Sequence, residues 1–263
     1  MMYQIVFSDA DGTLLDSNHC VLPHTREALQ MLKIPFVIVS GRYPCGIYSI
    51  MRKNGLKGPI ISCGGALILD EEHRLLYQHG MTKAQTAMVT AEIDAMPYDA
   101  TWNIFSLEDW LVRDPSHPRI RHEEKLLDAV SRAGSAADLA EDQQAHKVLC
   151  MCEPEETALV EKYLQTRLPQ LTVVRSSPIL VEIMQKGVNK AHAIEWLCSV
   201  LGISAENAIA FGDNYNDLEM LHAVGHPIVM ENAPGEIRAM FSDITTDNDH
   251  DGIVVALKRL KLI

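Results

Sequence analysis

Short apolar runs alternate with amphipathic segments along the first eighty residues of the chain. Buried strands are expected at residues 3–7, 36–39 and 59–62, helices at 23–33 and 45–53, and a hairpin over 66–69 and 74–77. Uninterrupted apolar strands separated by helices are typical of a parallel sheet that is covered on both faces. This part of the sequence therefore predicts an α/β fold.

The last eighty residues resume the same alternation. The pattern predicts a helix at 191–200, a strand at 208–211, a short helix at 217–223, a strand at 227–230 and a closing helix at 252–262. The two ends of the chain together predict one doubly wound, Rossmann-like parallel sheet.

The middle of the chain follows a different pattern, in which predicted strands come in adjacent pairs. The expected elements are a helix at 83–95, strands at 100–106 and 109–113, a helix at 119–133, a strand at 146–152, a helix at 155–167 and strands at 171–176 and 179–184. Such pairs favour an α+β layer with an antiparallel sheet. We therefore expect a separate domain at 82–185, inserted into an outer domain formed by 1–81 and 186–263.

Composition narrows the class of protein. Hydrophobic residues make up 47% and charged residues 22% of the chain, as is ordinary for a globular protein. Asp and Glu outnumber Lys and Arg by 35 to 23, which argues against a nucleic-acid partner. With no apolar stretch near the ~18 residues that span a bilayer and no signal-peptide pattern, we expect a cytoplasmic protein without a membrane partner. The oligomeric state stays open.

Polar residues follow three of the predicted strands at the point where each strand ends. Asp9 and Asp11 follow the first strand, Ser40-Gly41-Arg42 follow another, and a segment from Gly212 to Asp217 follows a third. Ligands of open parallel sheets bind beyond the carboxyl ends of the strands. Because neighbouring carboxylates repel, we expect a positive group between them.

The residue types at this edge indicate a hard metal ion and phosphoryl chemistry. Asp9, Asp213 and a contribution from Asp11 could supply Mg²⁺ with oxygen ligands. A carboxylate held beside Mg²⁺ can attack phosphorus, and a second acid two residues away can exchange the proton. Charge on the phosphoryl oxygens would be neutralised by Ser40, by backbone N–H groups near Ala10 and Gly41, and by one lysine.

The sequence leaves two assignments of basic residues open. Lys186 competes with Lys190 for the phosphate contact, and spacing to the following helix favours Lys190. Arg42 is equally compatible with a substrate contact and with a structural ion pair.

The chain resembles the haloacid dehalogenase (HAD) superfamily in four motifs that occur in order. These are Asp9-Ala10-Asp11-Gly12-Thr13-Leu14, Val39-Ser40-Gly41-Arg42, the segment around Lys190, and Phe211-Gly212-Asp213-Asn214-Tyr215-Asn216-Asp217. The spacing and the inserted domain resemble the Cof-type, subclass IIB phosphatases. One departure is Cys63-Gly64-Gly65-Ala66, where that group often has Asn-Gly-Ala, so an amide is missing.

The resemblance implies a role for each matching position. Asp9 would be the nucleophile and a magnesium ligand, and Asp11 the general acid and base, with its backbone carbonyl on the metal. Asp213 would ligate the metal, and Asp217 would belong to the metal site in its supporting shell. The residues implied for phosphate binding are Ala10, Ser40, Gly41, Lys190 and Asn216.

The predicted function is a Mg²⁺-dependent phosphatase that acts on a small phosphorylated metabolite through an aspartyl-phosphate. The resemblance points to sugar phosphates or phosphorylated cofactors, and the inserted domain would act as a cap that selects the leaving group. A phosphomutase and a non-catalytic sensor of a phosphorylated ligand are the alternatives.

Overall fold

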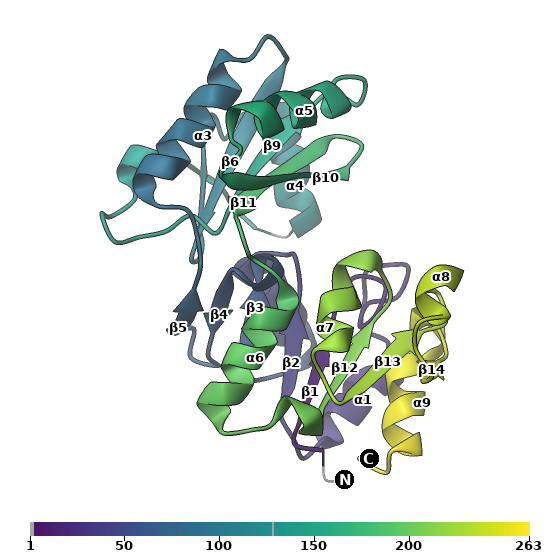
Figure 1. The fold of residues 1–263 in the computed structure, drawn as a ribbon. Helices are drawn as coiled ribbons and strands as arrows, with labels where there is room; N and C mark the ends of the chain where they lie inside the picture. Colours follow the sequence, from purple (N-terminus) through teal and green to yellow (C-terminus); the bar gives the residue numbers. More distant parts are fainter. Residues whose placement is uncertain (1–2, 128) are drawn as a thin grey trace. The chain divides into compact units, whose positions relative to one another are not determined.

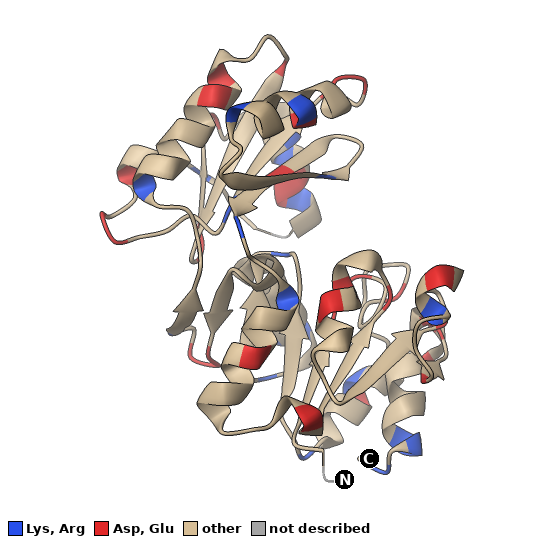
Figure 2. Cartoon of the chain, viewed as in Figure 1, with Lys and Arg blue, Asp and Glu red and all other residues tan. Residues whose placement is uncertain are grey.

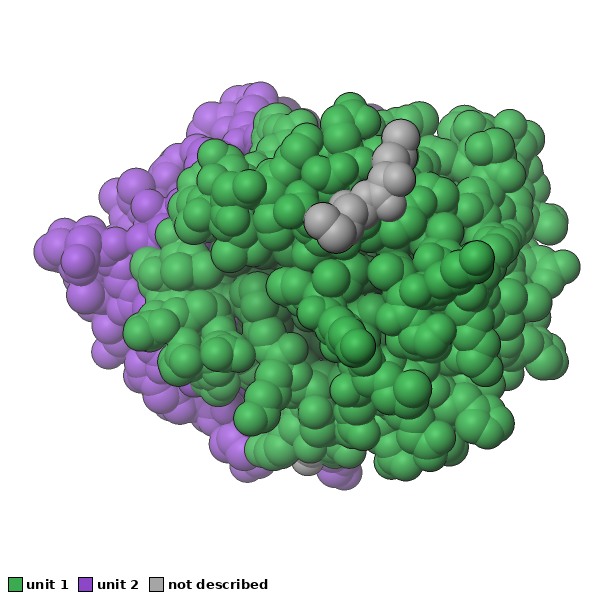
Figure 3. Space-filling model, turned by 90° about the horizontal axis from the view of Figure 1, so that it is seen from below, with its two compact units in different colours: residues 1–42, 47–76, 189–263 green, residues 43–46, 77–188 purple. Residues whose placement is uncertain are grey.

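The computed structural model describes residues 3–127 and 129–263, and these divide into two compact units (Figures 1 and 3). Unit 1 comprises residues 1–42, 47–76 and 189–263, and unit 2 comprises 43–46 and 77–188. Within this part of the chain, no helix is both long enough and apolar enough to cross a membrane. Acidic and basic residues are interspersed along the chain in both units (Figure 2).

The larger sheet has the strand order β14-β13-β12-β1-β2-β3-β4-β5. Its strands are β1 (Ile5–Ser8), β2 (Phe36–Val39), β3 (Ile60–Ser62), β4 (Leu67–Leu69), β5 (Leu75–Gln78), β12 (Ala208–Gly212), β13 (His226–Met230) and β14 (Ile244–Thr245). Pairing is parallel from β14 to β3 and antiparallel between β3 and β4. The doubly wound α/β fold predicted from the sequence is confirmed.

Helices cover both faces of this sheet. They are α1 (Pro23–Met31), α2 (Pro44–Asn54), α6 (Lys190–Leu201), α7 (Leu218–His222), α8 (Gly235–Arg238) and α9 (Gly252–Arg259). Figure 1 shows α6 and α7 on one face, with α1 and α9 on the other. All four residues of β1 and of β2 are buried, which explains why all of them except Ser8 are apolar.

The smaller sheet, in unit 2, has the order β10-β11-β9-β6-β7-β8. Its elements are α3 (Lys83–Ala95), β6 (Ala100–Ser106), β7 (Asp109–Val112), α4 (Pro118–Leu127), β8 (Arg132–Ala133), β9 (Lys147–Cys152), α5 (Thr157–Arg167), β10 (Leu171–Ser177) and β11 (Leu180–Gln185). Its pairs are antiparallel except for β7 with β8. Side chains from α3 and α5 pack on the sheet and form its apolar core.

The helix expected over 119–133 was wrong in its second half. Helix α4 ends at Leu127, residue 128 lies outside the described residues, and β8 pairs in parallel with β7. A carboxylate oxygen of Glu124 accepts hydrogen bonds from both the backbone N–H and the hydroxyl of Ser131, each at 2.8 Å. These bonds hold the chain folded back toward α4, so the helix does not continue.

Unit 2 also takes in short segments that the sequence assigned to the outer domain. Met81 exchanges two backbone hydrogen bonds with Ala145, at 2.8 and 2.9 Å, which attaches the segment after β5 to unit 2. The ring of His79 lies 2.9 Å from the carbonyl oxygen of Lys186. Tyr43 stacks on Phe105, with ring centroids 3.8 Å apart, which groups residues 43–46 with this unit.

Candidate active site

The carboxylates of Asp9 and Asp213 emerge from the carboxyl ends of two neighbouring strands. β1 and β12 pair in parallel register, with Ser8 opposite Phe211. The N–H of Asp9 donates to the carbonyl of Phe211 at 3.0 Å, so the pairing continues as far as Asp9. Both aspartates are almost completely buried, at 5% and 8% exposed. Strand pairing therefore brings two residues far apart in the sequence to one place.

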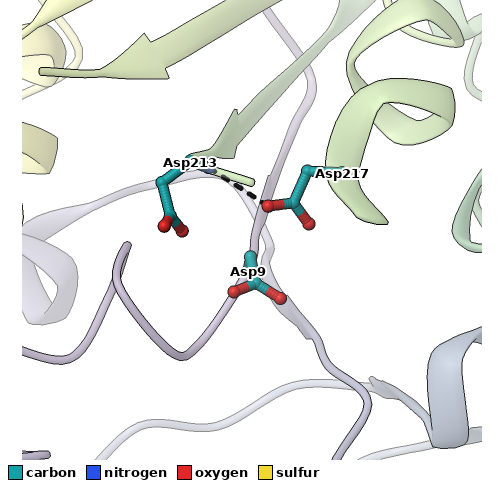
Figure 4. A group of neighbouring side chains, drawn as sticks. All are labelled: Asp9, Asp213 and Asp217. Carbon is teal, nitrogen blue, oxygen red and sulfur yellow. Dashed lines mark hydrogen bonds between the residues drawn. The ribbon is translucent and has the colours of Figure 1, made fainter. Parts of the chain in front are cut away.

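Asp217 and Lys190 complete a buried cluster of charges. Carboxylate oxygens of Asp9, Asp213 and Asp217 lie within 4.8 Å of one another (Figure 4). The Lys190 ammonium donates to Asp217 at 2.6 Å and also to Asp9. The other Asp217 oxygen accepts the backbone N–H groups of Asp213, at 3.1 Å, and Asn214, at 3.0 Å. Asp217 thus orients both the lysine and the loop that carries Asp213.

Negative charge in this cluster exceeds what the lysine neutralises. Burial raises the pKa of Asp9 to about 7, against the opposing effect of Lys190. Burial likewise raises the pKa of Asp213 to about 6, although a hydrogen bond from Thr13 lowers it. Burial alone would lower the pKa of Lys190, but the charges of Asp9 and Asp217 outweigh it and raise that pKa. The site holds an ionised lysine beside carboxylates that resist ionisation.

The start of helix α6 places Lys190. Asn189 precedes the helix and accepts the N–H of His192 at 2.8 Å with its side chain, as an N-cap does. Gly65 lies so close to the Asn189 carbonyl that a Cβ atom at this position would clash with it. Lys186, the competing lysine, is exposed and belongs to unit 2. Lys190 is therefore the lysine that contacts the aspartates.

Asp11 lies apart from the cluster of buried carboxylates. Its side chain accepts two hydrogen bonds from Arg42, from Nε at 2.8 Å and from a terminal nitrogen at 2.5 Å. Burial alone would raise the pKa of Asp11, but the hydrogen bonds and charge of Arg42, aided by His19, lower it. Arg42 therefore forms an ion pair with the second acid of the Asp-x-Asp motif.

The residues expected to bind phosphate occupy the loops at the same sheet edge. Ser40 follows β2, which pairs with β1, and its buried hydroxyl accepts the N–H of Arg42 at 3.1 Å. Gly41 is exposed beside it, and the carbonyl of Ala10 accepts the N–H of Leu15 at 2.9 Å. Asn216 is exposed in the turn η4 (Tyr215–Asp217), next to Asp217.

Sequence reasoning did not assign two residues that contact Asp213. The hydroxyl of Thr13 donates to Asp213 Oδ1 at 2.7 Å. Gly12 has φ +81°, and a Cβ atom there would lie 2.5 Å from Asp213 Oδ2. Both residues belong to the first motif, which could be recognised in the sequence. The sequence did not show that they contact Asp213, about two hundred residues away.

The carboxylate cluster fits a hard divalent cation. Its donors are carboxylate oxygens, the ligand type that Mg²⁺ prefers, and they are close enough together to share one ion. Burial is the main cause of the raised pKa values of Asp9 and Asp213, and a cation would relieve the repulsion between carboxylates that adds to it. Asp9 and Asp213 are the residues best placed to hold it, because both oxygens of Asp217 already accept hydrogen bonds.

Comparison with known proteins identifies the family. The haloacid dehalogenase-like hydrolase family matches residues 6–257 of this chain. The chain therefore belongs to the haloacid dehalogenase-like hydrolases, in the Cof-type subclass IIB that its motifs predicted.

Relatives of known name span nearly the whole chain. A Haemophilus influenzae protein, provisionally named a phosphatase, is 31% identical over 98% of both chains. The HMP-PP phosphatase of Serratia proteamaculans is 28% identical over 92% of this chain and 89% of its own. The crystal structure of a haloacid dehalogenase-like hydrolase from Bacteroides thetaiotaomicron superposes with a TM-score of 0.88 and 26% identity, covering 98% of this chain and 99% of its own.

Proposed function

We propose that this protein is a Mg²⁺-dependent phosphatase that hydrolyses small phosphomonoesters through an aspartyl-phosphate on Asp9. The observation that carries the proposal is the buried cluster of Asp9, Asp213 and Asp217 around the Lys190 ammonium. Relatives named as phosphatases support the reaction class. Sugar phosphates and phosphorylated cofactors are the substrate classes that we propose, with unit 2 as the cap that selects among them.

The proposed reaction has two displacements at phosphorus. Asp9 attacks, the bond from phosphorus to the ester oxygen breaks, and Asp11 gives its proton to the departing alcohol. Water then attacks the aspartyl-phosphate, Asp11 takes the proton from that water, and the bond from phosphorus to Asp9 breaks. Phosphate leaves, and both aspartates return to their starting forms.

The remaining residues would bind and orient the phosphoryl group. Lys190, the hydroxyl of Ser40 and backbone N–H groups near Gly41 would neutralise the phosphoryl oxygens, with Asn216 beside them. Asp9, the backbone carbonyl of Asp11 and Asp213 would hold Mg²⁺, with Asp217 in support. When bound, the ion would supply positive charge that favours ionised Asp9 and stabilises the phosphoryl oxygens.

The decisive experiment is the Asp9→Asn variant assayed for phosphate release from a panel of phosphate esters. Asparagine keeps the size of the side chain and removes the nucleophile, so we expect no turnover from a folded protein. Appreciable hydrolysis by Asp9→Asn would refute the assigned role. For the wild-type protein, release of isomerised sugar phosphate instead of inorganic phosphate would indicate a phosphomutase, and ligand binding without turnover would indicate a sensor.

A further inference from the structure

Two asparagines bind the loop that follows Asp9. They are Asn232, which follows β13, and Asn248, which follows β14. The side-chain N–H of Asn232 donates to the carbonyl of Gly12 at 2.8 Å. Its side-chain oxygen accepts the backbone N–H of Asn248 at 3.3 Å. Asn248, in the turn η5 (Asn248–His250), in turn donates from its own side chain to the carbonyl of Leu15 at 2.8 Å. Both ends of the Asn232 amide are therefore engaged.

The backbone that Asn232 holds lies directly against Asp213. At Gly12 the chain passes so close to Asp213 that a side chain would have no room. The next residue, Thr13, donates its hydroxyl to Asp213 Oδ1. A shift of the Gly12 carbonyl would move this hydroxyl, because the two groups are separated by a single peptide unit. The orientation of the Asp213 carboxylate thus depends on where Asn232 holds the loop.

We infer that Asn232 is a positioning residue for the metal site, acting on Asp213 through Gly12 and Thr13. The inference rests on the proposed function, in which Asp213 holds Mg²⁺. Asn232 is itself exposed, so its packing contributes little to the fold, whereas its amide binds a loop whose next residue, Thr13, is buried. Partners that orient a metal ligand typically change metal affinity or activity by about 10- to 100-fold when they are removed.

The test measures Mg²⁺ binding without substrate by isothermal titration calorimetry. For Asn232→Ala we expect the Mg²⁺ concentration at half-saturation, the midpoint, to increase about 10- to 100-fold. Asn18→Ala is the matched control, because Asn18 is exposed in the same loop region, and it should behave as wild type. An Asn232→Ala midpoint equal to that of Asn18→Ala would overturn the inference.

Asp213→Asn separates this inference from the function on which it rests. If Asp213→Asn keeps the wild-type response to Mg²⁺, the proposed metal site itself is wrong. If Asp213→Asn loses the response while Asn232→Ala keeps it, only the role of Asn232 falls.

A double-mutant cycle tests the route through Thr13. Thr13→Val removes the hydroxyl that contacts Asp213 and should also raise the Mg²⁺ midpoint. If Asn232 acts through this hydroxyl, the double variant should lose less affinity than the sum of the two single losses. Fully additive losses would show that Asn232 does not act through Thr13 and would overturn the proposed route.

Discussion

Arg42 and Asp11 form a two-point ion pair at the edge of the candidate active site. The guanidinium donates two hydrogen bonds, of 2.8 and 2.5 Å, to the two carboxylate oxygens. Such bidentate pairs favour the ionised carboxylate and fix its orientation. Arg42 therefore opposes the protonation of Asp11, which is the proposed acid. The pair also connects the second sequence motif, which contains Arg42, to the first motif, which contains Asp11.

Replacing Arg42 by methionine should move the pH–rate profile. In the proposed mechanism the basic limb of kcat/KM reports the pKa of the acid that protonates the leaving group. Because Arg42 lowers the pKa of Asp11, its loss should shift that limb to higher pH. Arg52→Met, at an exposed arginine of α2, is the matched control. An unmoved basic limb in Arg42→Met would show that Arg42 does not tune the acid.

Gly12→Ala should strongly reduce activity through crowding of Asp213. The added Cβ would lie 2.5 Å from the carboxylate, and φ +81° strains any residue other than glycine. We expect a loss of kcat/KM of about 100-fold or more, because Asp213 must move. Gly235→Ala, where nothing lies within 4 Å of the new Cβ atom, should retain full activity. Near-normal turnover in Gly12→Ala would contradict this geometry.

Lys190→Met should destabilise the metal-free protein, and more so at high pH. Removing one partner of a buried ion pair typically costs about 3–5 kcal/mol. The cost should be largest near pH 8, where Asp9 and Asp213 must be ionised, and smaller near pH 5, where protons neutralise them. Urea unfolding at both pH values measures the difference, with Lys186→Met, at an exposed lysine, as the control. Equal losses at both pH values would argue against charge as the cause.

The apparent affinity for Mg²⁺ should rise as pH increases from about 5 to about 8. The pKa of Asp9 is raised to about 7 and that of Asp213 to about 6, from 3.8, so protons compete with the metal across this range. In the absence of metal, the stability of the fold changes with pH in the opposite direction. The folded state binds more protons than the unfolded state, so stability falls as pH rises through the same range. Melting temperatures across pH, with added Mg²⁺ and with EDTA, check both trends, and Asp213→Asn should weaken them.

Unit 2 carries an independent pH dependence at His146. Burial lowers the pKa of this histidine from 6.5 to about 4, and its Nδ1 accepts the N–H of Leu107 at 3.2 Å. The pKa of His146 is lower in the folded state than in the unfolded state. Its contribution to stability is therefore fully present above pH 6.5 and is lost as pH falls toward 4. The loss should reach about 3 kcal/mol at most. His146→Asn should remove this slope in acid-unfolding experiments, whereas His122→Asn, at an exposed position, should keep it.

Most of the secondary structure could be read from the sequence because periodicity is a local property. The apolar run Phe36–Val39 and the capped helix Lys83–Ala95 occur where the pattern predicted them. The helix prediction failed after Leu127, where a side-chain bond from Ser131 to Glu124 decides the path of the chain. The two-residue strand β14 and the four-residue helix α8 were missed, because two strand residues or a single helical turn do not repeat the period that identifies the element.

What the sequence alone determined is the fold class and the family. The fold class follows from the local periodicity of apolar residues, and the family follows from motifs that each span only a few neighbouring residues. Only the tertiary structure decided that Lys190 contacts Asp9, that Arg42 pairs with Asp11, and that Asn232 reaches Gly12. The physical reason is the distance along the sequence: Asn232 and Gly12, for example, are 220 residues apart. Strand order and register bring such groups together, and a linear pattern of residue types does not encode which side chain will meet which.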